Sequence, residues 1–445
     1  MKLGVSSFCI ISVVLPLIFF QSYSYTFSQE TKVYTLEESI AEALAHNRVV
    51  KAKEERINQA VHAKNQARAE FLPKLSTSYG YTRLDKPSTV NLSIPGFGYT
   101  SMEISQQDNY QWKGTITQPV FTGFALISAY ELAKLGIDRS EIEFELQKLD
   151  LILNVKEAYF NILETDKAVQ VALKALELLK SHVEVAKGFY NAGKIPVNDL
   201  LKSEVELANA QQELVNVRNS SRMARCAFNA LLSKPVDLPV DVEDILTFIP
   251  REEDFYDNLE KAFENRPEIK ILDINILETE QQLRLAKSKL YPEISIKYDY
   301  IREGDTPGVN GSELQRSSRW EAMAICSWTF WEWGKTHYSI KEKMSLLNEL
   351  KQLRMSLTDI IQLELKEALL DLEAAEKNIP ATRIAVEQAE ENLRVSEERY
   401  KANVSTSTEV LDAQTLLTRA RMNHYRALYV HNLAIAKMER AVGSN

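Results

Sequence analysis

The chain has little of what a protein needs to turn sharply or to cross-link itself. Its 445 residues include only 14 glycines and 13 prolines, so few positions favour a change of direction. This scarcity predicts long, uninterrupted elements. Three cysteines are present, and only Cys226 and Cys326 lie beyond the N-terminal apolar run. Two cysteines exclude a small fold that depends on several disulfides.

Signatures of catalysis and of nucleic-acid binding are also lacking. The six histidines do not pair with cysteines or acidic residues at metal-ligand spacing, and the sequence contains neither a phosphate loop nor a Gly-x-Ser-x-Gly turn. We therefore expect no enzyme activity, no metal site and no cofactor. The formal net charge of −9 argues against a nucleic-acid partner.

Residues 1–24 have the pattern of a secretory signal peptide. Lys2 supplies a charged start, and Val5 to Phe20 is almost continuously apolar. Small residues follow at Ser22 and Ser24, which places the expected cleavage between residues 24 and 28. An uncleaved anchor is the alternative. No later stretch approaches about 20 apolar residues, so no transmembrane helix is predicted after the signal.

The remaining sequence contains a long internal repeat. The segment Phe71–Arg83 returns 219 positions later as Leu290–Arg302. A duplication of this period predicts two structural units that complete a common core together. We place the first repeat at 34–233 and the second at 252–443, separated by a proline-rich linker at 234–251.

Most of each repeat is expected to be helical. Segments rich in Ala, Glu, Lys and Gln, with few turn residues, predict six long helices. Their ranges are Leu36–Glu70, Ala125–Lys187, Val197–Leu232, Asp254–Lys289, Lys335–Ala402 and Glu409–Val442. Pro380 is expected to interrupt the fifth of them.

A heptad pattern predicts that these helices pair as coiled coils. In the second repeat the seam positions follow steps of three and four: Val386, Ala389, Leu393, Ser396 and Tyr400. A shift of 210 positions gives the seam of the first repeat: Leu176, Leu179, Val183, Ala186 and Tyr190. Charged residues occupy the opposite faces, which we interpret as solvated.

Four segments of a different character lie between the helices. Alternating large residues predict strands at Leu75–Arg83, Tyr110–Phe121, Ile294–Arg302 and Trp320–Phe330. Each is about 9 to 12 residues long, which is the length of a tilted membrane-spanning strand. Two soluble hairpins packed on the helices are the alternative.

Features at the ends of these strands support a membrane location. Trp328, Trp331 and Trp333 cluster at one end, as they would in an interfacial aromatic girdle. Polar loops at 84–109 and 303–318 are expected to be the outward tips. Four strands cannot close a barrel, and lipid does not tolerate an open sheet edge, so copies of the chain must share one barrel. Two copies would give a filled barrel of eight strands, and three would give twelve strands with a lumen.

Several motifs in order resemble those of the TolC-like outer-membrane efflux proteins. Phe71-Leu72-Pro73 and Leu290-Tyr291-Pro292 lead into strands, and Gln118–Gly123 and Phe330–Lys335 lead out of them. The most specific match is Arg399–Gln414, which is similar to the hairpin-tip motif of that family. The resemblance covers about Tyr34 to Gly443.

This resemblance implies an α+β membrane protein that forms a homotrimer. Four strands from each chain would make one 12-stranded transmembrane β-barrel in the outer membrane of a Gram-negative cell. A long α-helical coiled-coil barrel would continue through the periplasm. The expected partners are a periplasmic adaptor (membrane fusion) protein, an inner-membrane transporter and outer-membrane lipid.

The resemblance also assigns roles to residues at the helical tips. Glu409 and Asp412 match acidic positions that constrict the pore, and they lie one turn apart on one helix face. The alternative for Glu409 is an ordinary acid at a helix start. Asp199 and Tyr400 match a closed-state link between hairpins, whereas the arginine of that link is Ser405 here.

The function implied is that of a duct. The chain would be the outer-membrane channel of a tripartite efflux or type I secretion system, exporting small molecules or proteins to the exterior. The alternative is a secreted or periplasmic coiled-coil structural or adhesive protein without channel activity. Asn403, where the family has a tip glycine, and Ser405 both suggest a closed state that is less firmly held.

Overall fold

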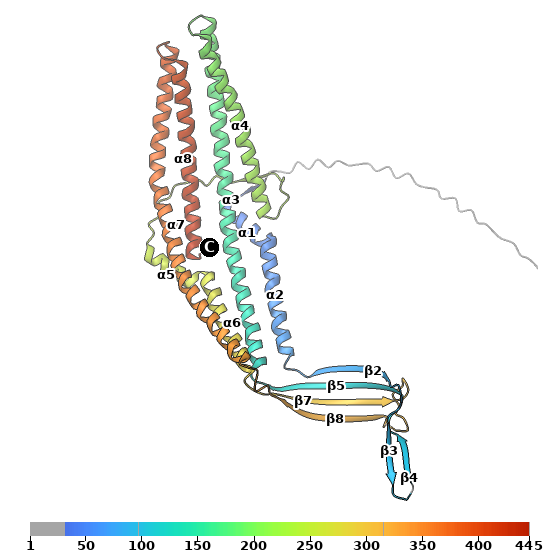
Figure 1. The fold of residues 1–445 in the computed structure, drawn as a ribbon. Helices are drawn as coiled ribbons and strands as arrows, with labels where there is room; N and C mark the ends of the chain where they lie inside the picture. The colour runs from blue at the N-terminus through green and yellow to red at the C-terminus, as the bar shows by residue number, and fades with distance from the viewer. Residues whose placement is uncertain (1–31, 97, 315, 445) are drawn as a thin grey trace, which may run out of the picture.

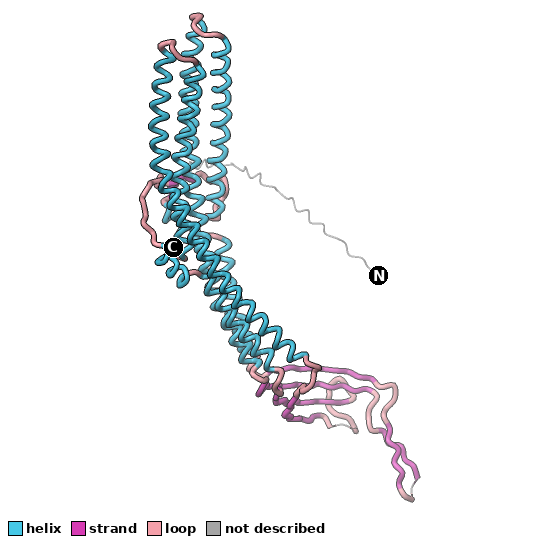
Figure 2. The backbone as a smooth tube through the Cα atoms, turned by 60° about the vertical axis from the view of Figure 1, so that its left-hand side comes forward, coloured by secondary structure: helices cyan, strands magenta, loops and turns pink. Residues whose placement is uncertain are grey.

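The computed structural model describes residues 32–96, 98–314 and 316–444, so the predicted signal peptide at 1–24 lies outside the described residues. The chain forms an elongated molecule with long helices at one end and a β-sheet at the other (Figure 1). The helices bend as they approach the sheet, as Figure 2 shows from a second side.

Helices make up most of the described chain. Their bounds are α1 (Leu36–His46), α2 (Arg48–Ala69), α3 (Ala125–Asn191), α4 (Val197–Leu231), α5 (Phe255–Asn265), α6 (Pro267–Ser288), α7 (Lys335–Lys401) and α8 (Ser407–Val442). The pairs α3–α4 and α7–α8 form two hairpins whose tips lie at the same end of the molecule (Figure 1). The predicted interruption at Pro380 is wrong, because α7 is a single helix of 67 residues that includes Pro380 in its interior. Among the described helices, none combines the length and apolarity needed to cross a membrane.

Two helices that the sequence predicts as continuous are each divided by a single residue. Asn47 ends α1 and caps α2, where its side-chain oxygen accepts a hydrogen bond from the Val49 amide at 2.9 Å. Arg266 separates α5 from α6 in the same way, and Pro267 begins α6. Both dividing residues have an extended ψ, 128° and 121°. The internal repeat therefore includes this break as well as the helices around it.

The apolar core lies where α1, α3 and α4 meet a small parallel sheet. Strands β1 (Lys32–Tyr34) and β6 (Val240–Val242) pair there, so the linker contributes to the core. Tyr159 is fully buried in this core, with its hydroxyl 3.0 Å from the Tyr34 carbonyl oxygen and 2.9 Å from that of Glu243. Burial raises the pKa of Tyr159 to about 12.

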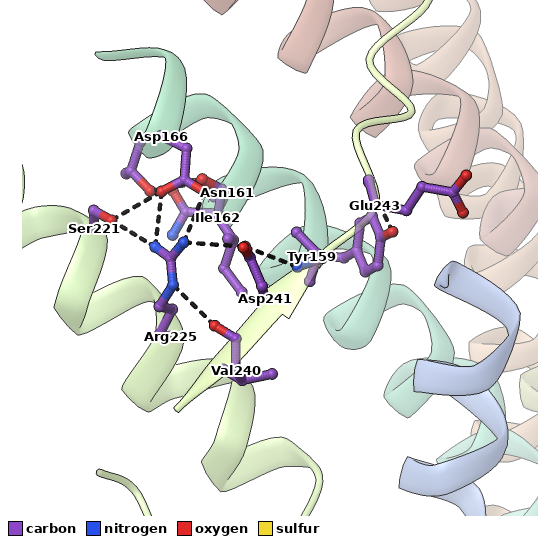
Figure 3. A network of polar contacts seen from close by, with 11 residues as sticks. Tyr159, Asn161, Ile162, Asp166, Ser221, Arg225, Val240, Asp241 and Glu243 are labelled. Atoms are coloured by element: carbon purple, nitrogen blue, oxygen red, sulfur yellow. Dashed lines mark hydrogen bonds and ion pairs between the residues drawn. The ribbon is translucent and has the colours of Figure 1, made fainter. Parts of the chain in front are cut away.

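An arginine network attaches the linker to the first hairpin (Figure 3). The Arg225 guanidinium donates to both carboxylate oxygens of Asp166, at 2.7 and 2.8 Å, and to the Ser221 hydroxyl oxygen at 2.6 Å. Its Nε donates to the Val240 carbonyl oxygen at 3.0 Å. Because the bidentate pair joins α3 to α4 and Nε reaches β6, a single side chain fixes three elements.

The larger sheet has the four predicted strands in the order β2-β5-β7-β8. Their bounds are β2 (Lys74–Arg83), β5 (Asp108–Thr122), β7 (Glu293–Gly304) and β8 (Ser318–Ser327). All neighbours are antiparallel, and the central pair joins a strand of the first repeat to one of the second. The outer edges of β2 and β8 have no partner strand among the described residues.

The loop predicted at 84–109 contains additional structure. Strands β3 (Thr89–Ile94) and β4 (Gly98–Glu103) pair as an antiparallel hairpin. This hairpin projects from the end of the sheet that is far from the helices (Figure 1). The loop thus lies at the end of the sheet far from the helices and contains a hairpin, whereas its outward location stays a prediction.

Candidate channel surfaces

The four-stranded sheet has one apolar, aromatic face. Alternate residues of each strand share this face, and most of the large ones are exposed, up to 77% for Leu75. Its large members are Leu75, Tyr79, Tyr81, Trp112, Ile116, Ile296, Tyr298, Tyr300 and Trp320. A water-facing sheet would not leave so many apolar side chains in contact with solvent, whereas a lipid-facing one requires them.

The opposite face of the sheet is charged and internally paired. Asp299 is only 1% exposed, and its carboxylate lies 2.8 Å from the Lys113 ammonium and 3.3 Å from that of Lys297. The Thr115 hydroxyl donates to the same carboxylate at 2.6 Å. Further polar members of this face are Gln111, Glu303, Arg319 and Glu321. One face suited to lipid and one suited to water is the pattern of a channel wall.

Exposed aromatic residues gather where the sheet joins the helices. Trp328, Trp331 and Trp333 follow β8, and Trp333 is 87% exposed. The Trp331 and Trp333 rings lie 5.8 Å apart. Phe124 and Tyr291, which the sequence prediction left out of this cluster, come from neighbouring connections and pack ring to ring at 5.9 Å. The structure shows these side chains exposed at one end of the sheet, and their role as an interfacial girdle stays a prediction.

The two hairpin tips have the same backbone geometry. Gly193 and Asn403 both adopt the left-handed conformation, with φ of 69° and 61°. At both turns the following amide donates back to the helix, from Lys194 to the Phe189 carbonyl and from Val404 to the Arg399 carbonyl. Asparagine is the residue that tolerates this conformation best after glycine, so Asn403 preserves the turn.

The predicted pore residues lie on an exposed face of α8. Thr406 caps the helix, accepting from the Glu409 amide at 3.4 Å, so Glu409 lies in the first turn and Asp412 in the next. Both side chains are exposed. Neither has an ion-pair or hydrogen-bond partner among the described residues, which leaves both carboxylates available to a pore.

No hydrogen bond joins Asp199 to Tyr400 among the described residues. Tyr400 is buried, and its hydroxyl lies beside Ser407 but makes no hydrogen bond of ordinary geometry in the described part of the chain. Burial first, and then the negative charge of Asp199, raise the pKa of Tyr400. The Asp199–Tyr400 link is therefore still a prediction.

The structure brings together three polar residues that the sequence did not single out. His182 of α3, Ser203 of α4 and Ser407 of α8 are all buried near the tips. The His182 Nε2 atom lies 2.7 Å from the Ser407 hydroxyl oxygen, which lies 2.9 Å from that of Ser203. In the sequence, the hint of this cluster is that His182 stands within an apolar heptad pattern.

The predicted seams are largely correct in the second hairpin and partly wrong in the first. Ala389, Leu393 and Tyr400 are buried as predicted. In the first hairpin Leu179 and Ala186 are buried, whereas Tyr190 is 41% exposed. His182 occupies the buried position between them, because the first hairpin packs against α8 as well as against its own partner helix.

Within the described ranges, no three His, Cys, Asp or Glu side chains are grouped so that they could hold a metal ion. The notable features are instead extended surfaces. The sheet has one face suited to lipid and one suited to water, and exposed aromatic residues lie where it joins the helices. Two long hairpins carry acidic residues behind one tip. Together they define a membrane channel protein.

Comparison with known families agrees with this class. The model of the outer membrane efflux protein family matches residues 39–233 and 258–444, and the chain belongs to this family. Members of the family are efflux channels rather than enzymes. The protein accordingly resides in the outer membrane of a Gram-negative cell, with its helical part in the periplasm.

The individual relatives share little sequence identity with this chain, but the similarity extends over most of their length. The chain is 21% identical over 420 residues to nodulation protein T of Rhizobium leguminosarum bv. trifolii, covering 91% of this chain and 84% of that one. It is 20% identical over 395 residues to outer membrane protein TolC of Escherichia coli strain K12, covering 85% and 76%. The CmeC outer membrane channel of Campylobacter jejuni shares the fold, with a TM-score of 0.78 at 15% identity, covering 98% and 94%.

Proposed function

We propose that three copies of this chain assemble into one export duct across the outer membrane. The observation that carries this proposal is the four-stranded sheet with one apolar face, one charged face and two edges without partner strands. Because β2 and β8 run antiparallel, β8 of one copy can pair with β2 of the next. Three copies supply twelve strands, enough for a barrel with a water-filled lumen lined by the charged face.

The two repeats build the same part of the architecture, but they differ in function. Repeats 34–233 and 252–443, joined by the linker 234–251, each give the trimer two strands and one helical hairpin. Six hairpins then form a coiled-coil barrel below the membrane barrel. The signal peptide at 1–24 directs the chain to the periplasm, and Trp328, Trp331 and Trp333 anchor the barrel at the lipid boundary.

The narrow end of the duct is formed by the second tip. Glu409 and Asp412 are exposed and unpaired among the described residues, so three copies place two rings of carboxylates around the axis. The first repeat has Asp199 and Lys202 at the matching positions, and opposite charges there would cancel. The rings favour cations and constrict the pore. Asp199, in the first turn of α4, and Tyr400, near the end of α7, help to hold the closed state.

The duct works as one component of a tripartite efflux or type I secretion system. A periplasmic adaptor protein engages the hairpin end, and an inner-membrane transporter supplies cargo and energy. The likeness in sequence to relatives over most of their length supports this role. Deleting the gene distinguishes the two systems: retention of small toxic compounds indicates efflux, and loss of a secreted protein indicates type I secretion.

Membrane fractionation and unboiled gels test the assembly. We expect the protein in the outer-membrane fraction as a band of about three chain masses that collapses to a monomer on boiling. A soluble periplasmic monomer would contradict the proposal and would favour the structural or adhesive alternative.

A further inference from the structure

The linker between the two repeats is attached to both of them. On the side of the first repeat, the Glu243 carbonyl oxygen accepts from the buried Tyr159 hydroxyl. The Asp244 carboxylate pairs with the Lys167 ammonium of the same helix, α3. A few residues later the linker contacts α7 and α8 of the second repeat. We call the segment that makes these later contacts, residues 247–251, the clasp. The linker therefore ties one helical hairpin to the other.

Polar contacts at both ends hold the clasp on the second hairpin. The Asn432 side-chain amide donates to the Thr247 carbonyl oxygen at 3.2 Å. The Arg251 backbone amide donates to the Glu376 carboxylate at 2.8 Å, and the Arg251 guanidinium donates to the Glu439 carboxylate at 3.2 Å. Single hydrogen bonds and exposed ion pairs each contribute little, so a change beneath the clasp can decide whether it stays attached.

A buried histidine without hydrogen bonds lies against the clasp. His431 of α8 is fully buried, and the Phe248 ring of the clasp packs against its ring at 5.2 Å. Neither imidazole nitrogen has a hydrogen-bond partner among the described residues. Buried polar atoms are normally paired, so packing rather than bonding holds this ring in place. Detachment of the clasp would take Phe248 away from the ring and admit water to it.

Burial and the surrounding charges together disfavour a proton on His431. From α7, the Glu376 carboxylate lies 3.9 Å from Nε2, but it already accepts from the Arg251 amide. From the clasp, the Arg251 guanidinium adds a positive charge. Within α8, the Glu439 carboxylate is bound to Arg251 and to Lys156 of α3. Burial outweighs the attraction of Glu376 and, with Arg251, lowers the pKa of His431 from its ordinary value of 6.5.

Attachment of the clasp and protonation of His431 therefore oppose each other. A protonated imidazole is poorly accommodated where it is buried and the Glu376 carboxylate is already engaged, but it is well accommodated in water. A group whose pKa is lowered in the attached state takes up its proton more readily once the clasp has detached. Acid consequently favours detachment, and neutral pH favours attachment.

We propose that residues 247–251 form an acid-sensitive clasp, which joins the two helical hairpins of a chain while His431 is neutral and detaches when His431 takes up a proton. Detachment leaves the first half of the linker on the first repeat and releases its tie to α7 and α8. The clasp and His431 belong to one chain, so the inference does not depend on the proposed duct. Within a duct, the clasp would let an acidic periplasm loosen the second hairpin.

Hydrogen–deuterium exchange of the clasp tests this directly. The purified protein in detergent is labelled at pH 7.5 and at pH 5.5, with labelling times scaled for the effect of pH on intrinsic exchange. The peptide that contains the Arg251 amide is followed, because that amide is bonded only while the clasp is attached. A histidine with an ordinary pKa of 6.5 that stays neutral under the clasp predicts about tenfold more detachment at the lower pH. Equal protection at the two pH values would overturn the proposal.

Variants that cannot titrate separate His431 from other acid-sensitive groups. His431→Leu and His431→Phe keep the site apolar, and the second keeps a ring against Phe248, so protection of the Arg251 amide should be the same at both pH values. His424→Leu is the matched control, because His424 is a partly buried histidine of α8 with a partner, its Nδ1 atom lying 3.2 Å from the Thr382 hydroxyl oxygen. That control should respond to acid as the wild type does. A loss of protection in either folded His431 variant that equals the loss in the wild type would show that the proposal is wrong.

Discussion

Neutralising the acidic residues behind the second tip is expected to weaken the preference of the channel for cations. Glu409 and Asp412 are exposed, and neither has an ion-pair partner among the described residues. The Glu409→Gln/Asp412→Asn double variant therefore removes charge, keeps side-chain size and leaves no cation unpaired. Stability is expected to change little, because only exposed groups are altered.

The size of the effect follows from simple electrostatics. A cation about 8 Å from one carboxylate in water is stabilised by about 0.5 kcal/mol. A Debye length of about 8 Å at physiological salt reduces this to about 0.2 kcal/mol. Three carboxylates in one ring then contribute about 0.6 kcal/mol, or about threefold in cation occupancy, and two rings contribute about sevenfold.

The reversal potential across a bilayer with a salt gradient measures this preference. We expect the cation-to-anion permeability ratio to fall several-fold in the double variant and by about the square root of that factor in each single variant. Glu264→Gln is the control, because Glu264 is exposed and unpaired in the described chain but lies in α5, away from the tips (Figure 1). An unchanged ratio in the double variant, or an equal fall in the control, would refute the reasoning.

Three other outcomes are expected. Tyr159→Phe removes a hydroxyl bonded to buried carbonyls, so the free energy of unfolding should fall by about 1–3 kcal/mol; an unchanged melting temperature in detergent would contradict this. His182 has a folded pKa of about 4 against 6.5 for the free group, so stability should be constant above about pH 6.5 and fall by about 3 kcal/mol towards pH 4. His182→Gln should lack that component of the acid loss, and an identical pH profile in that variant would show that another group is responsible. Trp331→Ser should let mild detergent extract more protein from membranes, and equal extraction would count against the girdle.

The extended elements could be predicted because they repeat. All four strands of the larger sheet and both long hairpins lie where alternation and the scarcity of turn residues place them, although β8 ends at Ser327, before the predicted end at Phe330. The breaks at Asn47 and Arg266 were missed, although each has a local signal in a capping asparagine or a following Pro267. Pro380 was misjudged, because a long helix packed on neighbours can retain a proline that would break an isolated one.

Only part of the candidate site could be predicted from the sequence. Exposed acids behind a helix cap, such as Glu409 and Asp412, follow from spacing once the hairpin tip is recognised. The cluster of His182, Ser203 and Ser407 does not, because three helices must meet before these residues become neighbours. The β3–β4 hairpin was hidden for another reason, since Gly and Pro residues between its strands suggested an irregular loop.

The most direct test of the account is the conductance of the purified wild-type oligomer in planar bilayers. A duct made of a shared barrel and paired hairpins predicts stepwise single-channel currents that favour cations. A heat-modifiable oligomer that inserts into bilayers and carries no current would contradict the central claim that this chain forms an open path through the membrane.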